Sequence, residues 1–268
     1  MTRLLTFVVA ALTLSLPGTH AQTGRDAPFD KLLDTYVRDG RVSYRGLQTD
    51  RATLDRYVRS LDMPASELAA LPRAEQKAFW LNAYNALVLQ TVVANYPIRG
   101  SSTLYPRNSI RQIPGAFERL PHRVAGATLT LDAIEQRMLK EFGDARIVLA
   151  LGRAALGSGR LRSEAYQADR VEDQLQEALK ECVARLACVA LDRDAKTVTV
   201  TPMIGWRTEA FEQAFIPAAG AAWPARSPIE RAVAAMLLPV LFPTEQAFLK
   251  EDTFRLAYGE FDWSLNEL

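Results

Sequence analysis

Histidine and cysteine are almost absent from this sequence, and their scarcity excludes several kinds of chemistry. The chain of 268 residues has two of each, His20, His122, Cys182 and Cys188. They form no HExxH segment, no CxxC pair and no mixed cluster, which are the spacings that bind zinc. We therefore expect no metal site and no cofactor. A Ser-His-Asp or Cys-His device would depend on His122, whose segment RLPHRVAG predicts a loop leading into a strand and a surface position.

The chain also lacks a phosphate-binding loop and a surplus of charge of either sign. GRAALGSGR, residues 152–160, has the composition of such a loop but no following Lys-Ser/Thr pair. There are 32 Lys+Arg against 31 Asp+Glu, a formal net charge of +1. A balanced surface has no broad basic field to attract nucleic acid or an anionic membrane. We expect neither as a partner.

The first 21 residues have the three-part pattern of a secretory signal peptide. MTRLLTFVVAALTLSLPGTHA contains one basic residue, Arg3, then a largely apolar stretch over 4–16, then Pro17-Gly18 and a small residue, Ala21. The stretch is shorter than the ~20 apolar residues that a membrane helix needs. We expect cleavage after residue 21 and a soluble protein exported to the periplasm, without stable membrane insertion.

Apolar periodicity predicts an α+β fold in which helices predominate and the strands form small antiparallel hairpins. Helical spacing occurs over 30–38, 47–61, 73–96, 130–142, 169–184, 203–215 and 228–238. Hairpins are expected over RVAGATLTLD, with Ala125-Gly126 at its turn, and over CVALDRDAKTVTV. Segment 145–156 is apolar enough to be buried, as helix or strand, and 98–115 is irregular. No linker or repeat divides residues 22–268, so we expect a single domain.

Two asparagines lie inside one of the most apolar segments, KAFWLNAYNALVLQTVVANYP. Asn82 and Asn85 are three residues apart and share a helix face. A buried amide without partners costs about 1–3 kcal/mol, so both need specific partners. Either they bond to the backbone of a neighbouring loop, with 98–115 the first candidate, or they line a polar cleft.

The two cysteines fall where a helix is expected to end and a strand to begin. In an oxidising compartment Cys182 and Cys188 can form a disulfide. The alternative is a pair of buried free thiols.

Several motifs occur in an order that points to one family. They are VSYRGL, AFWLNAYNAL, TLTLDAIEQRML, ARIVLAL followed by LRSEAY, and FDWSLN. With these motifs the chain resembles the domain of unknown function 547 family over nearly all of residues 22–268. The family's activity is unassigned, and its members are often secreted bacterial proteins. The resemblance implies a central site, around which this chain keeps Asn82, Asn85, Glu135 and Arg146.

The departures from the family pattern fall on reactive side chains. Where the resemblance implies two histidines, this chain has Gln136 and Val148, and where it implies two cysteines, it has Arg153 and Ser158. Valine has no proton to transfer, and arginine stays protonated and is no nucleophile. The joint loss of four reactive groups is typical of a retired or repurposed site.

The arginines that follow the buried segment indicate what a repurposed site would bind. Guanidinium groups suit carboxylates and phosphates, which predicts a non-catalytic receptor for a small anionic ligand. The alternative is a solvated, charged turn. The candidate ligand-binding residues are Asn82, Asn85, Glu135, Gln136, Arg146, Arg153, Ser158 and Arg162, with Arg160 nearby.

Two other functions stay open at this point. The first is a hydrolase- or transferase-type enzyme without histidine or cysteine, in which Glu135 is the acid/base and Ser158 a weaker nucleophile. A buried Glu135 that faces Asn82 would support it. The second is an envelope interaction module that binds a protein partner through its surface and has no pocket.

Overall fold

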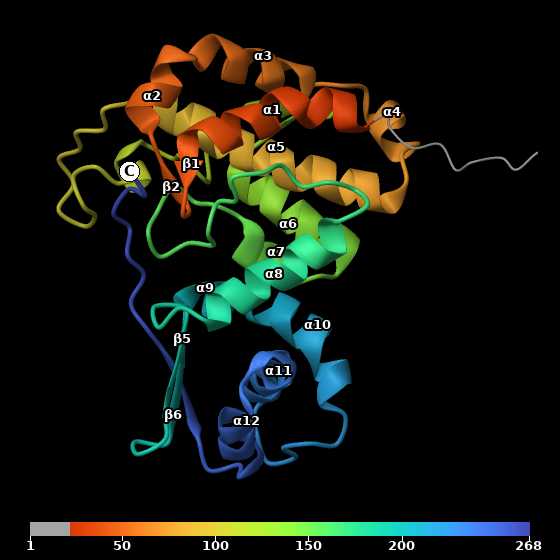
Figure 1. The fold of residues 1–268 in the computed structure, drawn as a ribbon, viewed down its shortest axis with the longest axis vertical. Coiled ribbons are helices and arrows are strands. Elements are labelled where there is room, and N and C mark those ends of the chain that lie inside the picture. The colour runs from red at the N-terminus through yellow and green to blue at the C-terminus, as the bar shows by residue number, and fades with distance from the viewer. Residues whose placement is uncertain (1–21) are drawn as a thin grey trace, which may run out of the picture.

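The computed structural model describes residues 22–268, so the predicted signal peptide, residues 1–21, lies outside the described residues. Figure 1 shows a larger helical lobe above a smaller lobe. The larger lobe contains the helices α1 (Gln22–Tyr36), α2 (Tyr44–Thr49), α3 (Arg51–Ser60), α4 (Ala65–Ala69), α5 (Arg73–Ala94), η1 (Ile110–Gln112), α6 (Leu131–Phe142), α7 (Arg146–Ala150) and α8 (Val171–Val183). The smaller lobe contains α9 (Pro202–Trp206), α10 (Thr208–Ala219), α11 (Pro228–Leu237), η2 (Leu238–Val240) and α12 (Pro243–Lys250).

The strands of residues 22–268 form three small sheets. β1 (Val37–Arg38) pairs antiparallel with β2 (Arg41–Val42), and β3 (His122–Val124) with β4 (Ala127–Leu129). β5 (Val189–Asp192) and β6 (Thr197–Val200) form the other predicted hairpin, and β7 (Arg255–Tyr258) joins β6 in parallel. The predicted class, α+β and mainly helical, is confirmed, but the third sheet is mixed rather than a simple hairpin. That residues 22–268 are a single domain stays a prediction.

Helix α5 is the centre of the larger lobe. Every side chain over residues 77–89 is buried, and α5 packs against α2, α3 and α6 (Figure 1). Trp80, Phe79 and Tyr84 are among its fully buried side chains. Burying a large apolar side chain stabilises the fold by about 1.5–3 kcal/mol, so this helix anchors everything that packs on it.

Two helices expected to be continuous are each broken in the structure. The segment 47–61 divides at Asp50 into α2 and α3, and the segment 203–215 divides at Arg207 into α9 and α10. Apolar periodicity continues across both breaks, which is why the sequence alone predicts one helix in each case. The break at Arg207 matters for the site described below, because Trp206 and Arg207 both face it.

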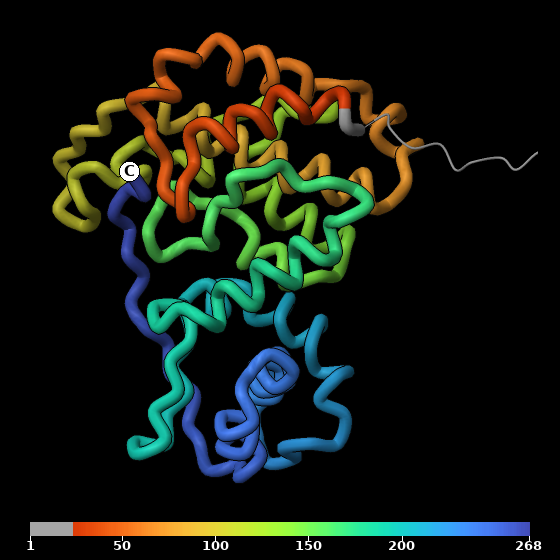
Figure 2. Tube along the Cα trace, in the orientation of Figure 1, coloured from red at the N-terminus to blue at the C-terminus, as the bar shows by residue number. Residues whose placement is uncertain are grey.

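The C-terminal segment connects the two lobes. Figure 2 shows this last stretch, in blue, rising from the smaller lobe to the β1–β2 hairpin. The backbone N–H of Val42 donates to the carbonyl of Asn266 (2.8 Å), and the Tyr44 hydroxyl donates to the Asn266 side chain (2.7 Å). These bonds hold Trp263, a few residues upstream, against the larger lobe.

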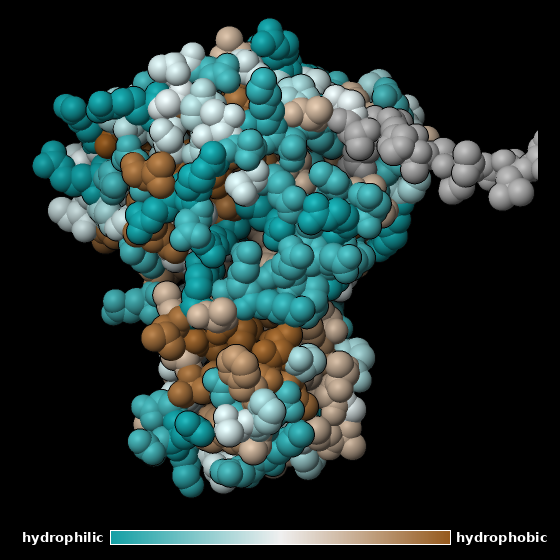
Figure 3. All heavy atoms as spheres, in the orientation of Figure 1, coloured by the Kyte–Doolittle hydropathy of each residue, from teal (hydrophilic) through white to brown (hydrophobic). Residues whose placement is uncertain are grey.

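The surface of the smaller lobe is the more apolar of the two in the view of Figure 3. Hydrophobic side chains gather between α9 and α11 and beside the β5–β6 hairpin, whereas the larger lobe is mostly hydrophilic. No helix within residues 22–268 is both long enough and apolar enough to span a membrane.

Cys182 and Cys188 are bonded to each other in the structure. Both side chains are buried, and their Cα atoms lie 5.3 Å apart. The bridge joins the last turn of α8 to the start of β5, so it fixes the direction in which the chain enters the smaller lobe.

His122 is buried, and the surface position expected for it is wrong. It begins β3 and is 8% exposed, because the alternation of that short strand turns His122 and Val124 inward and Arg123 outward. Its Nε2 atom is buried and has no hydrogen-bond partner among the described residues. Burial lowers the pKa of His122 to about 4.

Acidification should destabilise the protein through His122. The folded-state pKa of about 4 lies below the unfolded value of ~6.5, so the unfolded chain takes up the proton first. The part of the free energy of unfolding that depends on a neutral His122 is fully present above pH ~6.5. It is lost as the pH falls toward ~4, by up to about 3 kcal/mol. Urea unfolding across this range should show a smaller loss of stability for His122→Gln than for the wild type. If the free energy of unfolding fell equally with pH in the two proteins, His122 would not be the cause of the acid destabilisation.

Candidate functional site

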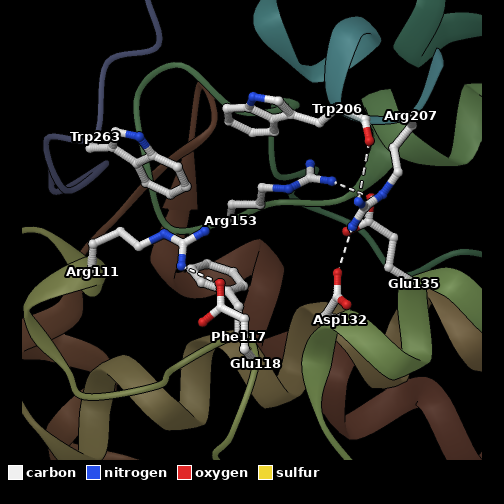
Figure 4. Close-up of a pocket in the computed structure, with 9 residues that line it drawn as sticks. All are labelled: Arg111, Phe117, Glu118, Asp132, Glu135, Arg153, Trp206, Arg207 and Trp263. Carbon is white, nitrogen blue, oxygen red and sulfur yellow. Dashed lines mark hydrogen bonds and ion pairs between the residues drawn. The ribbon is translucent and has the colours of Figure 1, made fainter.

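A pocket of about 250 Å³ lies where the two lobes meet. Its walls come from the 110–118 segment, α6, the loop after α7, the α9–α10 break and the C-terminal segment. Its lining residues, drawn in Figure 4, are Arg111, Phe117, Glu118, Asp132, Glu135, Arg153, Trp206, Arg207 and Trp263.

One side of the pocket is a buried cluster of ion pairs around Glu135. Arg153 Nη2 and Arg207 Nε both donate to Oε1 of Glu135, at 2.7 and 3.0 Å (Figure 4). The side chains of Arg153 and Glu135 are only 5% and 4% exposed. Arg207 also donates to Asp132 at 2.6 Å. Burial alone would lower the pKa of Arg207, but the carboxylates of Glu135 and Asp132 outweigh it and raise the pKa.

Arg153 is further fixed by backbone contacts. Its Nη1 donates to the carbonyl oxygens of Val148 (3.1 Å) and Leu151 (3.4 Å). Arg153 stands where the resemblance implies a cysteine, and Val148, whose carbonyl accepts from Arg153, stands where it implies a histidine. The guanidinium group of Arg153 is therefore held between Glu135 and the backbone of the segment that carries both positions.

The opposite side of the pocket holds Arg111, a residue that the sequence analysis did not single out. Its guanidinium carbon lies 4.7 Å from the ring centroids of both Phe117 and Trp263, and its Nη1 pairs with Glu118. The Arg111 and Glu118 side chains are 26% and 51% exposed. Arg111 Nε is buried without a hydrogen-bond partner in the described part of the chain. The segment has no periodicity, so nothing in the sequence marked this residue.

Aromatic rings form the third wall. Trp206 stacks on Trp263 with centroids 5.8 Å apart and an interplanar angle of 15°, and it contacts Phe261 at 4.8 Å. Trp206 is nevertheless 42% exposed. It ends α9, and Arg207 begins the next turn in a non-helical conformation, so the helix break presents both residues to the pocket.

Asn82 and Asn85 do not line this pocket, and they do not bond to the 98–115 segment as expected. Asn82 donates to the carbonyl of Tyr166 (2.9 Å) and accepts from its N–H (2.8 Å), and Asn85 accepts from the N–H of Gly152 (2.8 Å). Both amides therefore brace the 150–166 segment. Because Gly152 precedes Arg153, Asn85 helps to place the backbone that carries that arginine.

The other predicted site residues lie in separate places. Arg146 pairs with Asp144 and Glu172, next to the buried Lys77. Gln136 is on the exposed face of α6. Ser158 is buried and donates to the carbonyl of Ala155 (2.7 Å), which leaves it no role as a nucleophile in the pocket.

Arg162 lines a second pocket, also of about 250 Å³. It pairs there with Glu164 (2.6 Å) and Glu177 (2.7 Å), and Arg160 pairs with Asp39. The structure thus brings Glu135 and Arg153 together and separates them from Arg146, Ser158 and Arg162.

The charges of the first pocket are balanced, with three guanidinium groups and three carboxylates among its lining residues. Arg153 and Arg207 are both held by the buried Glu135, whereas Glu118, the partner of Arg111, is half exposed. Across residues 22–268 there is no group of three or more His, Cys, Asp or Glu side chains arranged to hold a metal ion. The chemistry that this arrangement offers is hydrogen bonding, ion pairing and ring stacking.

These features define a mainly helical α+β protein with an ion-paired, aromatic-walled pocket between its lobes. Residues 68–183 match the profile of the family described as "Protein of unknown function, DUF547", which confirms the resemblance over that part of the chain. The match includes Arg111, Glu135 and Arg153 but ends before Trp206 and Trp263. No curated protein and no solved structure matches the chain.

Proposed function

We propose that this is an exported, non-catalytic binding protein, and that its pocket takes a small ligand whose carboxylate binds Arg111. The observation that carries the proposal is the guanidinium of Arg111, held between two aromatic rings at the pocket wall. A cation that is already oriented loses little conformational entropy when a ligand binds it.

Arg111 is the arginine best suited to exchange its partner. A partly exposed ion pair such as Arg111–Glu118 is worth about 0–1 kcal/mol, so a ligand carboxylate can replace Glu118 at little cost. The pair between Arg153 and Glu135 is buried, and separating buried partners costs about 3–5 kcal/mol. We therefore propose that the anion binds to Arg111, and not to Arg146, Arg153 or Arg162 as the sequence predicted.

The state of Glu135 favours binding over catalysis. Glu135 is buried, but its hydrogen bonds are to Arg153 and Arg207 rather than to Asn82. Oε1 of Glu135 already accepts from two guanidinium groups inside the protein, which is the arrangement of a structural ion-pair partner rather than of a group free to reach a substrate. The pocket beside Arg153 also argues against an interaction module without a pocket.

Export is supported by two separate features of the chain. Residues 1–21 have the pattern of a signal peptide. The disulfide between Cys182 and Cys188 is of the kind that persists in oxidising compartments such as the periplasm.

Small carboxylates should bind residues 22–268 and change the intrinsic tryptophan fluorescence. Of the four tryptophans, Trp206 and Trp263 line the pocket, while Trp80 and Trp223 are buried elsewhere. We expect Arg111→Gln to weaken binding about tenfold or more, as loss of a charge-assisted bidentate contact does. Arg162→Gln, which removes an arginine from the other pocket, is the matched control and should bind as the wild type. Equal losses in both variants, or no binding by any carboxylate, would overturn the proposal.

A further inference from the structure

The indole of Trp206 is the most exposed of the aromatic rings that line the pocket. It is 42% exposed although one side of it stacks on Trp263 and Phe261. A large apolar ring left open to water in this way gains free energy when a flat apolar surface covers it. The ligand should therefore carry a ring that can lie on Trp206.

The wall opposite Arg111 offers hydrogen-bonding groups of both kinds. Asp132 and Glu135 supply acceptor oxygens, and Arg207 lies between them as a donor (Figure 4). Both bonds to Glu135 end on Oε1, and no donor among the described residues reaches its Oε2. A hydroxyl group can donate to a carboxylate and accept from a guanidinium at once, which neither a second carboxylate nor an apolar edge can do.

Trp206 offers a surface for a ring, and Arg111 offers a partner for a carboxylate. The wall opposite Arg111 offers hydrogen-bonding partners for hydroxyl groups. We infer that the ligand is a sugar ring that carries a carboxylate, a uronic acid. This inference rests on the proposed function and names its ligand class. The C–H face of the pyranose would cover Trp206, its carboxylate would bind Arg111, and its hydroxyl groups would bond to Asp132 and Glu135. The volume of about 250 Å³ lies just below the range of roughly 300–1,000 Å³ for drug-sized ligands and suits one monosaccharide.

Other carboxylates satisfy only part of this arrangement. An aromatic acid would cover Trp206 and reach Arg111, but its apolar edge would desolvate the acidic wall without replacing the lost hydrogen bonds. An acyclic sugar acid has the hydroxyl groups but no ring face for Trp206. A dicarboxylate would place a second negative charge beside Asp132 and Glu135.

Titration with glucuronate, galacturonate, glucose, benzoate and acetate tests the inference. We expect a uronate to bind at least about tenfold more tightly than each of the other three. Trp206→Ala should weaken uronate binding by a similar factor, and Trp206→Phe, which keeps a ring, should restore part of it. Phe242→Ala, which removes an exposed ring outside the pocket, should change nothing.

The outcomes separate this inference from the proposed function. In one outcome, benzoate or acetate binds as tightly as the uronates while Arg111→Gln still weakens binding. That result would overturn the inference of a sugar ring but not the proposal that Arg111 binds a carboxylate. Glucose binding as tightly as glucuronate, with no effect of Arg111→Gln, would overturn the carboxylate anchor and hence both. No binding by any of the five would also overturn both.

Discussion

Arg153→Met is expected to lower the free energy of unfolding by about 3–5 kcal/mol, the largest effect of any single change considered for this protein. The reason is the carboxylate left behind. Glu135 is 4% exposed and accepts from Arg153 and Arg207 through one oxygen, so removing Arg153 leaves a buried charge with half its support. The carbonyl oxygens of Val148 and Leu151 lose a donor as well. Equilibrium urea unfolding measures the change.

A double variant tests whether the destabilisation comes from losing the Arg153–Glu135 interaction or from leaving the Glu135 carboxylate buried and unpaired. In Arg153→Met combined with Glu135→Leu, no unpaired carboxylate remains, and Arg207 keeps Asp132 as its partner. Replacing both members of a buried pair by apolar residues is often neutral or stabilising, so most of the stability should return. Arg162→Met is the matched control, because its acidic partners are partly exposed and its ion pairs should contribute no more than about 1 kcal/mol. An Arg153→Met loss no larger than this control would show that the pair is open to water.

Asn82→Ala is expected to cost about 2–3 kcal/mol, for a different reason. The Asn82 amide donates to the carbonyl of Tyr166 and accepts from its N–H, and all these groups are buried. The change leaves two backbone groups of Tyr166 without partners, and each unsatisfied buried group costs about 1–3 kcal/mol. Thermal or urea unfolding would measure the loss.

Two comparisons sharpen the Asn82 prediction. Asn82→Asp keeps an acceptor for the Tyr166 N–H but loses the donor and buries a charge, so it should destabilise at least as much as Asn82→Ala. Asn95→Ala removes an amide at the exposed end of α5, where it bonds to the carbonyl of Thr91, and surface changes of this kind usually stay within about 0.5 kcal/mol. Similar values for Asn82→Ala and Asn95→Ala would mean that the Tyr166 contact contributes little.

Much of the fold could be predicted from local patterns, and the errors come from contacts between residues far apart in the sequence. Thr130 caps α6 by accepting from the N–H of Ala133, and Ala125-Gly126 form the turn of the β3–β4 hairpin, as turn and cap residues indicate. A strand was expected at FRLAY, but its parallel pairing with β6 was not, because β6 and β7 lie far apart in the sequence. The break at Arg207 was missed because side-chain contacts with Glu135 and Asp132, rather than a helix-breaking residue, accompany it.

The candidate site was less predictable than the fold. Residues close in sequence, such as Arg146, Arg153, Ser158 and Arg162, were expected to act together, but helix α7 and the loop after it point them in different directions. Arg111 and Trp206 carry no local signal, since an arginine in an irregular segment and a tryptophan at a helix end are both common. Only their shared neighbour, Trp263, shows that they belong to one pocket.

The sequence by itself determined the helical α+β class, the buried position of α5, the need for partners at Asn82 and Asn85, and the scarcity of imidazole and thiol groups. These properties follow from composition and from spacing along a few turns of chain. The tertiary structure alone decided which charges meet. An ion pair forms between side chains that the fold brings within about 4 Å, however far apart they are in sequence. For that reason Arg153 became the partner of Glu135, and Arg111 became the guanidinium that faces the pocket.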